Sequence, residues 1–467
     1  MSPSLIMERD RKSDLVVEPA RLSGTIAAIP SKSYAQRLFI ASALADRPTK
    51  IEFDVPVGLS GDNYSTIMAL KSIVAELEFR HDGVVVSPLA PSCEGSKKSS
   101  VCLNVEESGT AARLLLPILV ALFDEGVLEG SGSLLTRPFE TLCASLEAGS
   151  NVVKEKLKFD SQVLPISWRG KLQPGSYRLP GDESSQYISG LLMALPLLGG
   201  DSELVLSSPL QSVGYVDMTL DVLELFGIKI ERDGDTYRIP GRQMYKSPLS
   251  VEVEGDWSNS AFWLAAGIEL RGLNPQSLQL DRLFLEVKDQ AEIDAVNIPD
   301  LVPILSVYAA LKEGTTVITG IERLRIKESD RIETTFAMLD ALGCAVELGP
   351  VDEIWTSIDE VDPFDKSELG KAWENHKLAL TIHGTGDIFG GGVINGANDH
   401  RIVMAAAIAG SFAQTPVTIL GAQAVAKTYP HFFEDFMSLG GHVKKRPGGS
   451  LARIFGRKEG PAKTELN

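Results

Sequence analysis

The sequence predicts an α/β protein of two domains, and three observations lead to this fold class. At 467 residues the chain exceeds the length at which one hydrophobic core keeps growing, so about two domains are expected. A polar motif followed by a short stretch that is apolar all round occurs six times. An amphipathic stretch followed by glycine and a β-branched run alternates with this first pattern. Three such units per domain would surround interior helices with sheets and outer helices.

Each of the six polar motifs precedes a stretch that we interpret as a buried helix, because helices that are apolar all round usually lie in the interior. Examples of these stretches are LFIASALA, LLLPILVAL and IVMAAAIAG. In chain order, the motifs are SKSYAQR (31–37), ESGTAAR (107–113), GDESSQ (181–186), GDWSNS (255–260), NIPD (297–300) and NDHR (398–401).

The alternating stretches are predicted to be amphipathic helices with one face toward water. Glycine is favoured just after a helix, and the β-branched run beyond it suits a strand. The unit around residues 271–297 lacks a clear copy and is interpreted as degenerate. The alternative is an ordinary α/β protein in which the alternation arises by chance. The clear copies are DMTLDVLELFGIKIE, RIETTFAMLDALGCAVE and YPHFFEDFMSLGGHVKK, and the looser ones are DNYSTIMALKSIVAELEF and RPFETLCASLEAGSNVV.

Composition and charge exclude several functional classes. The formal net charge of −17 argues against a nucleic-acid groove or an anionic membrane surface as partner, although a local basic cluster can still bind a small anion. Neither a secretory signal nor a transmembrane stretch is recognisable, so we expect a soluble, cytoplasmic protein. The acidic segment 349–377 is expected to be a surface excursion between two strands. The cysteines lack zinc-site spacing and are expected to be reduced thiols: Cys93, Cys102, Cys143 and Cys344.

The motifs also predict an anion site in the gap between the domains. Helix N-termini carry unpaired N–H groups and partial positive charge, so several of them aimed at one gap would attract anions. Lysine and arginine in the first turn of a helix oppose its dipole, and a bound anion would compensate them. Phosphate and carboxylate groups suit this role, and arginine can bind a carboxylate through two parallel hydrogen bonds. The cations that the motifs and turns supply are Lys32, Arg37, Arg113, Arg137, Lys327, Arg331, Arg401 and Lys427.

Two acidic residues and one histidine near these motifs each allow two interpretations. Asp300 can cap a helix or take part in chemistry, and Glu328 can be a capping or salt-bridge residue or a proton donor. Between cations a carboxylate usually stays ionised unless burial raises its pKa, and the sequence leaves this open. His400 can be a general acid or base, or a packing residue. The stretch SSQY (184–187) suits phosphate or polyhydroxyl recognition, with a plain serine cap as the alternative.

The motifs resemble those of the 5-enolpyruvylshikimate-3-phosphate synthase family, in order and at similar spacing, over roughly residues 20–445. The motifs that carry this resemblance are PSKSYAQR, ESGTAAR, TRP, ESSQ, QSVGY, IPD, RIKESDR, NDHR and AKTYP, of which RIKESDR and NDHR are the most specific. The resemblance implies a two-domain inside-out α/β barrel, in which each domain has three βαβαββ repeats with buried helices. Domain I would comprise residues 14–30 and 255–457, domain II residues 31–254, and the active site would lie in the interdomain cleft.

The resemblance also implies the reaction. The enolpyruvyl group of phosphoenolpyruvate would move to the 5-hydroxyl of shikimate 3-phosphate and phosphate would leave, a step on the route to chorismate and the aromatic amino acids. This family is the target of glyphosate. We expect no metal and no organic cofactor, no nucleic-acid or membrane partner, a monomer, and domain closure over the two substrates.

Site residues follow from the resemblance, motif by motif. Asp300 would accept the proton of the 5-hydroxyl, and Glu328 would protonate the methylene carbon of phosphoenolpyruvate, helped by Lys32. Phosphoenolpyruvate would be held by Lys32, Gly109, Arg137, Gln186, Arg331, Arg401 and Lys427. Shikimate 3-phosphate would be held by Lys32, Ser33, Arg37, Ser184, Ser185, Gln186, Ser212, Tyr215, Asp300 and Lys327.

Three positions depart from the common family pattern. Glu107 stands where asparagine is common, Leu114 where proline is common, and Arg323 where asparagine is frequent.

The main rival is the sister enolpyruvyl transferase that acts on UDP-N-acetylglucosamine. That family carries a cysteine in the loop before its Arg-Pro, whereas the loop here is GSGSLLTRP. A second rival is a noncatalytic anion-binding repeat protein, which would need the cations but not Asp300 and Glu328. A ring-shaped clamp on DNA would need basic interior helices, and these are apolar.

Overall fold

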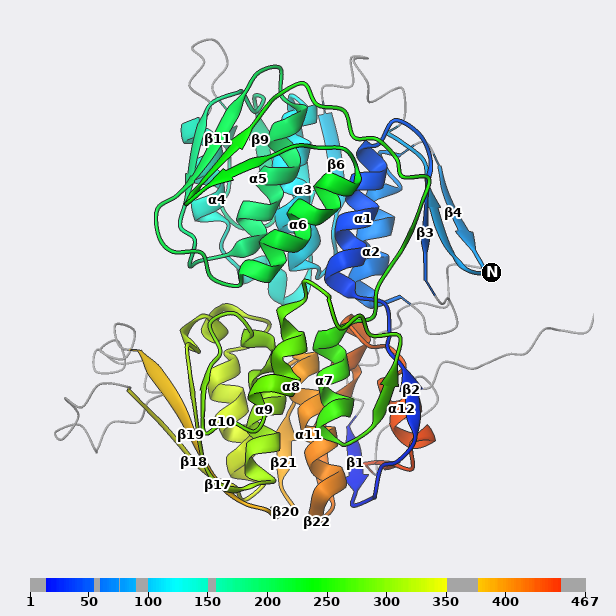
Figure 1. Ribbon diagram of the computed structural model, residues 1–467, viewed down its shortest axis with the longest axis vertical. Helices are drawn as coiled ribbons and strands as arrows, with labels where there is room; N and C mark the ends of the chain where they lie inside the picture. Colours follow the sequence, from blue (N-terminus) through cyan, green and yellow to red (C-terminus); the bar gives the residue numbers. More distant parts are fainter. Residues whose placement is uncertain are drawn as a thin grey trace, which may run out of the picture.

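The computed structural model describes residues 14–53, 59–74, 76–89, 100–149, 157–350 and 377–446. They form two lobes stacked along the long axis of the molecule (Figure 1). The core of the upper lobe is drawn from residues 35–253, and that of the lower lobe from residues 15–29 and 261–439. The chain passes between the lobes at two adjacent places, where Pro30 and Gly255 form an isolated β-bridge. The fold is therefore a two-domain α/β fold with one hydrophobic core in each lobe.

Within the described residues, three four-stranded sheets form the outer wall of the upper lobe and share one arrangement. In each sheet a parallel pair of strands is extended by two antiparallel strands. In spatial order, the first sheet consists of β14 (Ser250–Glu252), β3 (Thr49–Glu52), β5 (Gly83–Val86) and β4 (Leu77–Arg80). The second consists of β6 (Ser100–Asn104), β7 (Glu125–Glu129), β9 (Ile166–Arg169) and β8 (Lys158–Phe159). The third consists of β10 (Ser176–Leu179), β11 (Ser202–Leu206), β13 (Thr236–Ile239) and β12 (Glu231–Asp233).

The lower lobe repeats this arrangement in two sheets and departs from it in the rest. The two full sheets again have a parallel pair followed by two antiparallel strands. Two small parallel pairs complete the wall. One full sheet consists of β16 (Glu292–Asp294), β17 (Glu313–Thr319), β19 (Leu378–Thr385) and β18 (Ala345–Pro350). The other consists of β21 (Val393–Asn395), β23 (Val417–Leu420), β1 (Leu15–Glu18) and β24 (His442–Lys445). In the small pairs, β15 (Glu269–Arg271) lies beside β2 (Thr25–Ala27), and β20 (Ile388–Gly390) lies beside β22 (Ala413–Thr415).

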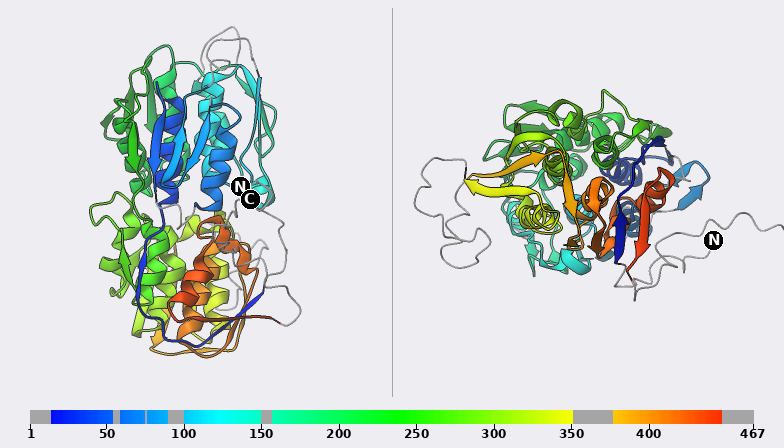
Figure 2. Two further views of the ribbon diagram at one scale, coloured as in Figure 1. Left: turned by 90° about the vertical axis from the view of Figure 1, so that its right-hand side faces the viewer. Right: turned by 90° about the horizontal axis from the view of Figure 1, so that it is seen from below.

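The N-terminal strand β1 is built into the sheet of the C-terminal half. It pairs antiparallel with β23 on one side and β24 on the other, so that Val17 lies opposite Val417 and Val443. The view from below shows this strand, in dark blue, beside the red strand β24 (Figure 2). Leu15 and Val17 point into the lower core, whereas Val16 lies on the other face and is half-buried.

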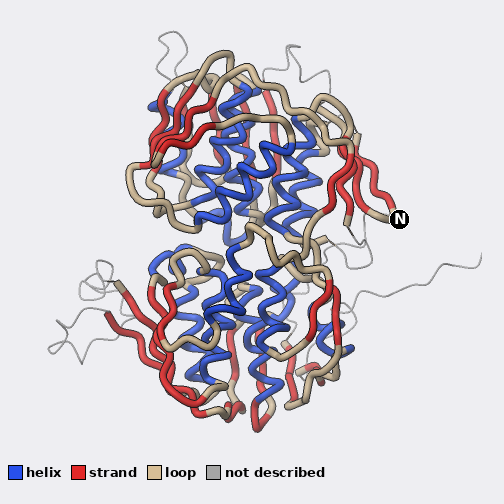
Figure 3. The backbone as a smooth tube through the Cα atoms, in the orientation of Figure 1, coloured by secondary structure: helices blue, strands red, loops and turns tan. Residues whose placement is uncertain are grey.

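Helices fill the inside of both lobes and strands cover them (Figure 3). Of the helices in the described ranges, one begins at each of the six polar motifs, and these helices are almost entirely buried. An apolar surface all round suits this position, because every face of the helix meets another element. They are α1 (Lys32–Leu44), α3 (Gly109–Leu122), α5 (Ser185–Ala194), α7 (Trp257–Ala265), α9 (Val302–Ala310, preceded by the 3₁₀ turn η6, Pro299–Leu301) and α11 (His400–Phe412).

The helices begin earlier than the sequence pattern suggests, because several motifs lie inside the helix rather than before it. Ser31, Ser108 and Asp256 cap α1, α3 and α7 through side chains that accept N–H bonds of the first turn. The basic residues of three motifs therefore lie within the first two turns of α1, α3 and α11. Arg37, for example, lies in the second turn of α1 and is 1 % exposed.

The amphipathic stretches form outer helices, as predicted, with one face buried and one exposed. The unit around 271–297 is indeed incomplete, since its outer helix is reduced to the short α8 (Phe284–Val287) after the 3₁₀ turn η5 (Leu280–Leu283), and β15 pairs with β2 alone. The outer helices are α2 (Gly61–Leu70), α4 (Glu140–Gly149), α6 (Val213–Leu225), α10 (Arg331–Ala341) and α12 (Phe432–Ser438).

Three smaller expectations can be compared with the structure. In the part of the chain that is described, Cys102, Cys143 and Cys344 are free thiols, and Cys93 lies outside it. No helix within these ranges has the length and apolarity to cross a membrane. Residues 351–376 of the acidic segment also lie outside the described residues, and the segment joins β18 to β19, which pair with each other.

Replacing Val17 by alanine should destabilise the lower lobe, although this residue lies far from that core in sequence. A fully buried valine that loses two methyl groups leaves a cavity and is expected to cost about 1–3 kcal/mol in the free energy of unfolding. Val16→Ala, on the other face of the same strand, is the matched control and should cost less than about half of that. Urea denaturation measures both, and equal losses would show that β1 does not contribute to the core as described.

Candidate active site

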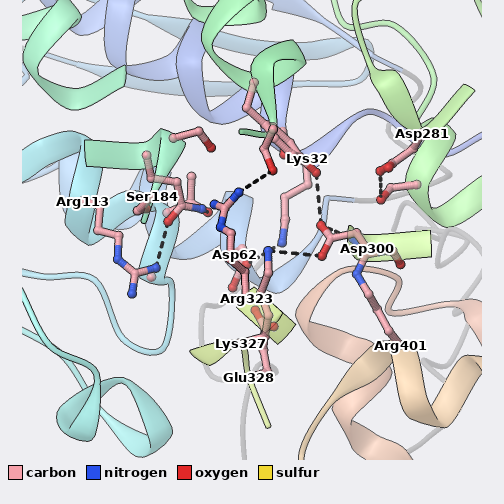
Figure 4. Close-up of a pocket in the computed structure, with 18 of the residues that line it drawn as sticks. Lys32, Asp62, Arg113, Ser184, Asp281, Asp300, Arg323, Lys327, Glu328 and Arg401 are labelled. Carbon is pink, nitrogen blue, oxygen red and sulfur yellow. Dashed lines mark hydrogen bonds and ion pairs between the residues drawn. The ribbon is translucent and has the colours of Figure 1, made fainter. Parts of the chain in front are cut away.

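The starts of the six interior helices meet at one pocket between the lobes. Each helix places at least one residue of its first turns, or of the turn just before it, on the pocket wall. The helices α1, α3 and α5 belong to the upper lobe, and α7, α9 and α11 belong to the lower lobe (Figure 1). A close-up of the pocket is given in Figure 4. In helix order, examples are Lys32, Gly109, Ser185, Ser258, Asp300 and His400.

Every residue that the sequence nominated for the site lines this pocket, together with Arg113 and His400. The structure thus brings together side chains from both halves of the chain. The residues are Lys32, Ser33, Arg37, Gly109, Arg137, Ser184, Ser185, Gln186, Ser212, Tyr215, Asp300, Lys327, Glu328, Arg331, Arg401 and Lys427.

Arg331, the first residue of α10, is the centre of the charge network. Its guanidinium is 1 % exposed and donates to Asp399 through Nε at 2.7 Å and to Asp300 through Nη1 at 2.7 Å. It also donates to Glu328 through Nη2. Burial alone would lower the pKa of Arg331, but Asp399, Glu328 and Asp300 raise it above its usual value. The guanidinium is therefore permanently charged and is held in one orientation.

Asp300 is held by cations from several directions and does not act as a helix cap. Its carboxylate accepts hydrogen bonds from Arg331 and Arg401, lies 3.5 Å from Lys327 Nζ, and accepts from the Tyr215 hydroxyl at 3.1 Å. Figure 4 shows the side chains of Lys327 and Arg401 turned toward Asp300. Burial would raise the pKa of Asp300, yet Arg401, Lys327 and Arg331 bring it well below its usual value. The carboxylate is ionised and can accept a proton.

Glu328 also stays ionised, which resolves the question that the sequence left open. Its carboxylate binds Arg331 and lies 3.9 Å from Arg137, a cation of the opposite lobe. Burial again would raise the pKa of Glu328, but Arg331 and then Arg137 hold it well below the usual value. Asp330 is the residue that caps α10.

His400, the first residue of α11, is buried and uncharged. Burial and then the nearby Arg401 lower the pKa of His400 well below its usual value. Neither ring nitrogen has a hydrogen-bond partner among the residues that the structure describes. A neutral imidazole in the pocket wall can donate a hydrogen bond to a ligand, or accept one from it.

Hydroxyl and amide groups gather on the upper side of the pocket. Arg113 Nη1 donates to Gln186 Oε1 at 2.9 Å, which fixes the amide of Gln186 beside Ser184 and Ser185. Ser212 accepts from Arg323 Nη1 at 3.0 Å across the two lobes. Arg323 is thus part of the site although the sequence left its role in doubt.

Arg37 is less free than its place in the motif suggests. Its Nε donates to Thr219 at 2.7 Å, Nη1 to the Ser33 carbonyl at 2.8 Å, and Nη2 to the Tyr215 carbonyl at 3.0 Å. Burial lowers the pKa of Arg37 to about 10, so it remains charged near neutral pH. Most N–H groups of the Arg37 guanidinium therefore bind the protein, and these hydrogen bonds connect α1 to α6.

The protein itself supplies much of the negative charge that the sequence analysis assigned to a bound anion. That expectation overlooked carboxylates whose nearness depends on tertiary contacts. Lys32 Nζ lies 3.1 Å from Asp62 on α2, and the Lys32 N–H donates to Asp256, the cap of α7. Asp399 binds Arg331 and caps α11. Its place inside the NDHR motif was the one feature of the sequence that could have indicated a role in the site.

A further carboxyl group of the pocket wall, that of Asp281, was also missed. It accepts a hydrogen bond from Ser258 and is 6 % exposed. Burial, followed by repulsion from Asp300, raises the pKa of Asp281 to about 6. In the described ranges, no three His, Cys, Asp or Glu side chains are grouped so that they could hold a metal ion.

Comparisons with known proteins identify relatives over most of the chain. The family model described as EPSP synthase (3-phosphoshikimate 1-carboxyvinyltransferase) matches residues 16–292 and 277–436. The 3-phosphoshikimate 1-carboxyvinyltransferase of Clostridium kluyveri is 35% identical over 456 residues, covering 91% of this chain and 97% of that protein. The protein of the same name from Clostridium acetobutylicum is 35% identical over 457 residues, with the same coverage.

A solved structure of EPSP synthase from Acinetobacter baumannii has the same fold, with a TM-score of 0.70 at 24% identity, covering 93% of this chain and 100% of that one. Together, the comparisons favour this family over the UDP-N-acetylglucosamine transferase and over a noncatalytic anion-binding protein.

Asp281 should make stability depend on pH in a defined direction. The carboxyl group of Asp281 binds its proton more tightly in the folded protein than in the unfolded chain, because its pKa is about 6 in the folded state and 3.8 in the unfolded state. Stability is therefore lost as pH rises between these two values. Asp281→Asn cannot ionise, so its stability relative to the unmodified protein should increase over this window by on the order of 2–3 kcal/mol.

Urea denaturation at a series of pH values measures this difference. Asp387→Asn, at an exposed aspartate, is the control and should show no such increase with pH. A difference between Asp281→Asn and the unmodified protein that does not change with pH would contradict the assignment.

Proposed function

The chain belongs to the EPSP synthase family, and from this premise we propose how its two domains and its pocket residues carry out the reaction. It is a transferase of the shikimate pathway that moves the enolpyruvyl group of phosphoenolpyruvate to shikimate 3-phosphate. The observation that carries the assignment of the site is one pocket in which six helix starts, a set of cations, Asp300 and Glu328 meet.

We propose that each domain is an inside-out barrel of three βαβαββ repeats. The support is the strand arrangement shared by five sheets, each with a buried and an outer helix beside it. Residues 31–254 would form domain II, and residues 14–30 with 255–457 would form domain I. The two hydrophobic cores and the bridge between Pro30 and Gly255 support these boundaries.

The proposed phosphoenolpyruvate site combines cations of both domains with the N-terminus of α3. Gly109 is the first residue of that helix, so its N–H and the helix dipole can meet a phosphate oxygen. A side chain at 109 would lie 3.1 Å from Arg137 Nη1, which favours glycine there. The proposed ligands are Lys32, Gly109, Arg137, Gln186, Arg331, Arg401 and Lys427.

The proposed shikimate 3-phosphate site lies against α1, α5 and α6. Serine hydroxyls and helix N–H groups there suit a phosphate and a ring with several hydroxyls. Asp300 and Lys327 of the lower lobe would reach the same ring from the opposite side. The proposed ligands are Lys32, Ser33, Arg37, Ser184, Ser185, Gln186, Ser212, Tyr215, Asp300 and Lys327.

We propose that Asp300 and Glu328 transfer the protons. Asp300 would take the proton of the 5-hydroxyl group while the oxygen of that hydroxyl bonds to C2 of phosphoenolpyruvate. Glu328, with Lys32, would deliver a proton to the methylene carbon, giving a tetrahedral intermediate with a methyl group. The bond between C2 and the phosphate oxygen would then break, and the proton on Asp300 would pass to the departing phosphate. One methyl proton would return to Glu328 as the double bond forms again.

The charge network explains how ionised carboxylates become useful in these steps. Arg331 and Arg401 bind Asp300, and Arg331 binds Glu328. When polyanionic substrates share these guanidinium groups, each carboxylate loses part of its compensation and its pKa rises. Asp300 then becomes a stronger base, and Glu328 can carry the proton that it donates.

We further propose that the enzyme acts as a cytoplasmic monomer, without nucleic acid, membrane, metal ion or organic cofactor. The net charge of −17 disfavours polyanionic surfaces as partners. Substrate positioning by the cationic pocket supplies the catalysis in this proposal.

Asp300→Asn should abolish most of the turnover. Asparagine keeps the size and the contact with Tyr215 but cannot accept the proton, so kcat should fall about 10²- to 10³-fold. Release of inorganic phosphate from mixed phosphoenolpyruvate and shikimate 3-phosphate measures this. Asp340→Asn, on the exposed side of α10, is the control and should keep its activity. An Asp300→Asn enzyme with normal kcat would remove Asp300 from the proposed chemistry.

Addition of shikimate 3-phosphate should compact the protein in solution. The two lobes contact each other through Tyr215 with Asp300 and through Ser212 with Arg323, and these residues line the proposed sugar-phosphate site. A ligand that bridges them would favour the closed arrangement. Small-angle scattering should show a smaller radius of gyration with shikimate 3-phosphate than without it, and an unchanged radius would contradict closure.

A further inference from the structure

One carboxylate in the pocket, that of Glu107, pairs with a cation of the opposite lobe. Lys427 Nζ lies 3.1 Å from Glu107 Oε2 and donates to the Asn398 carbonyl at 2.9 Å. The side chains of the pair are 10% and 16% exposed, so solvent screens them only in part. Both residues line the pocket.

The surroundings hold this pair in place on both sides. A Cβ at Gly132 would overlap the Glu107 carboxylate and lie 2.9 Å from its Cγ, so glycine at 132 leaves the space that the carboxylate occupies. Gly132 begins η3 (Gly132–Thr136), the turn just before Arg137. On the other side, a Cβ at Gly61 would lie 2.8 Å from the Ala426 carbonyl, which shows how closely α2 approaches the turn that bears Lys427.

Glu107 also lies next to the N-terminus of α3 in the chain. It directly precedes Ser108, the cap of this 14-residue helix, and Gly109 follows as the first helical residue. A negative charge at this end is stabilised by the helix dipole and the free N–H groups. The carboxylate of Glu107 and a phosphate group bound at Gly109 and Lys427 would therefore be attracted by the same positive charges.

We infer that Glu107 lowers the affinity of the pocket for phosphoenolpyruvate and for inorganic phosphate, because it competes with both for Lys427. This inference rests on the proposed role of Lys427 in binding phosphoenolpyruvate. A dianionic phosphate that approaches Lys427 must share the ammonium with Glu107 and meets the repulsion of its charge. Glu107 thereby weakens the binding of small anions, and it favours departure of the phosphate product.

The test is Glu107→Gln, which keeps the size of the side chain beside Gly132 and removes its charge. The KM for phosphoenolpyruvate and the inhibition constant of inorganic phosphate against it should both fall, by about three- to tenfold. The KM for shikimate 3-phosphate should stay unchanged. An unchanged or higher KM for phosphoenolpyruvate would overturn the inference.

The matched control is Glu106→Gln. Glu106 is the adjacent residue, but its carboxylate accepts from Ser65 at 2.8 Å and it does not line the pocket. Both kinetic constants should keep their values in this variant. A second variant, Glu107→Asp, retains the charge but shortens the side chain, so its constants should lie between those of the unmodified enzyme and Glu107→Gln.

Lys427→Ala, alone and combined with Glu107→Gln, separates failure of this inference from failure of the proposed function. If Lys427→Ala raises the KM for phosphoenolpyruvate, the proposed binding site stands, and the effect of Glu107→Gln then tests the inference alone. In the double variant the gain from Glu107→Gln should largely disappear, because the group for which the anions compete is absent. If Lys427→Ala leaves this KM unchanged, the proposed role of Lys427 fails, and the inference fails with it.

Discussion

The buried guanidinium of Arg331 is the interaction on which the pocket depends. It is 1 % exposed and is bound by Asp300, Glu328 and Asp399, which come from the starts of α9, α10 and α11. A buried charge without partners would be strongly destabilising, so these three carboxylates and their helices must converge for the fold to tolerate it. The same contacts keep Asp300 and Glu328 ionised. Structure and chemistry thus share one set of contacts, and removal of Arg331 would disturb both.

The lobes are connected by groups that also line the pocket. Tyr215 with Asp300, Ser212 with Arg323 and Glu107 with Lys427 each join one lobe to the other. A ligand that binds between the lobes replaces some of these contacts with its own contacts to the same residues. Affinity for each substrate therefore depends on the contacts that it replaces as well as on those that it makes.

Much of the site could be predicted from the sequence, because the chemistry is concentrated at helix starts. Lys32, Gly109 and Arg401 stand in or beside short polar motifs, and each motif is followed by an unmistakably apolar helix. The resemblance to a known family then supplied the roles. Asp62 and Asp281 had no such signal, because neither lies in one of the six polar motifs and each enters the pocket only through the packing of its own helix or turn. Arg37 was recognised, yet its engagement by Thr219 and by the Tyr215 carbonyl could not be foreseen.

The sequence by itself determined the interior and outer helices, their alternation, and the cations at the helix starts. These features depend on residues close together in the chain, through periodicity and local hydrogen bonds. Only the tertiary structure decided which carboxylate meets which cation, and hence that Asp300 and Glu328 are ionised and His400 is neutral. Those outcomes depend on distances between residues far apart in the chain and on burial, because a pKa responds to the charges and the solvent around a group in space.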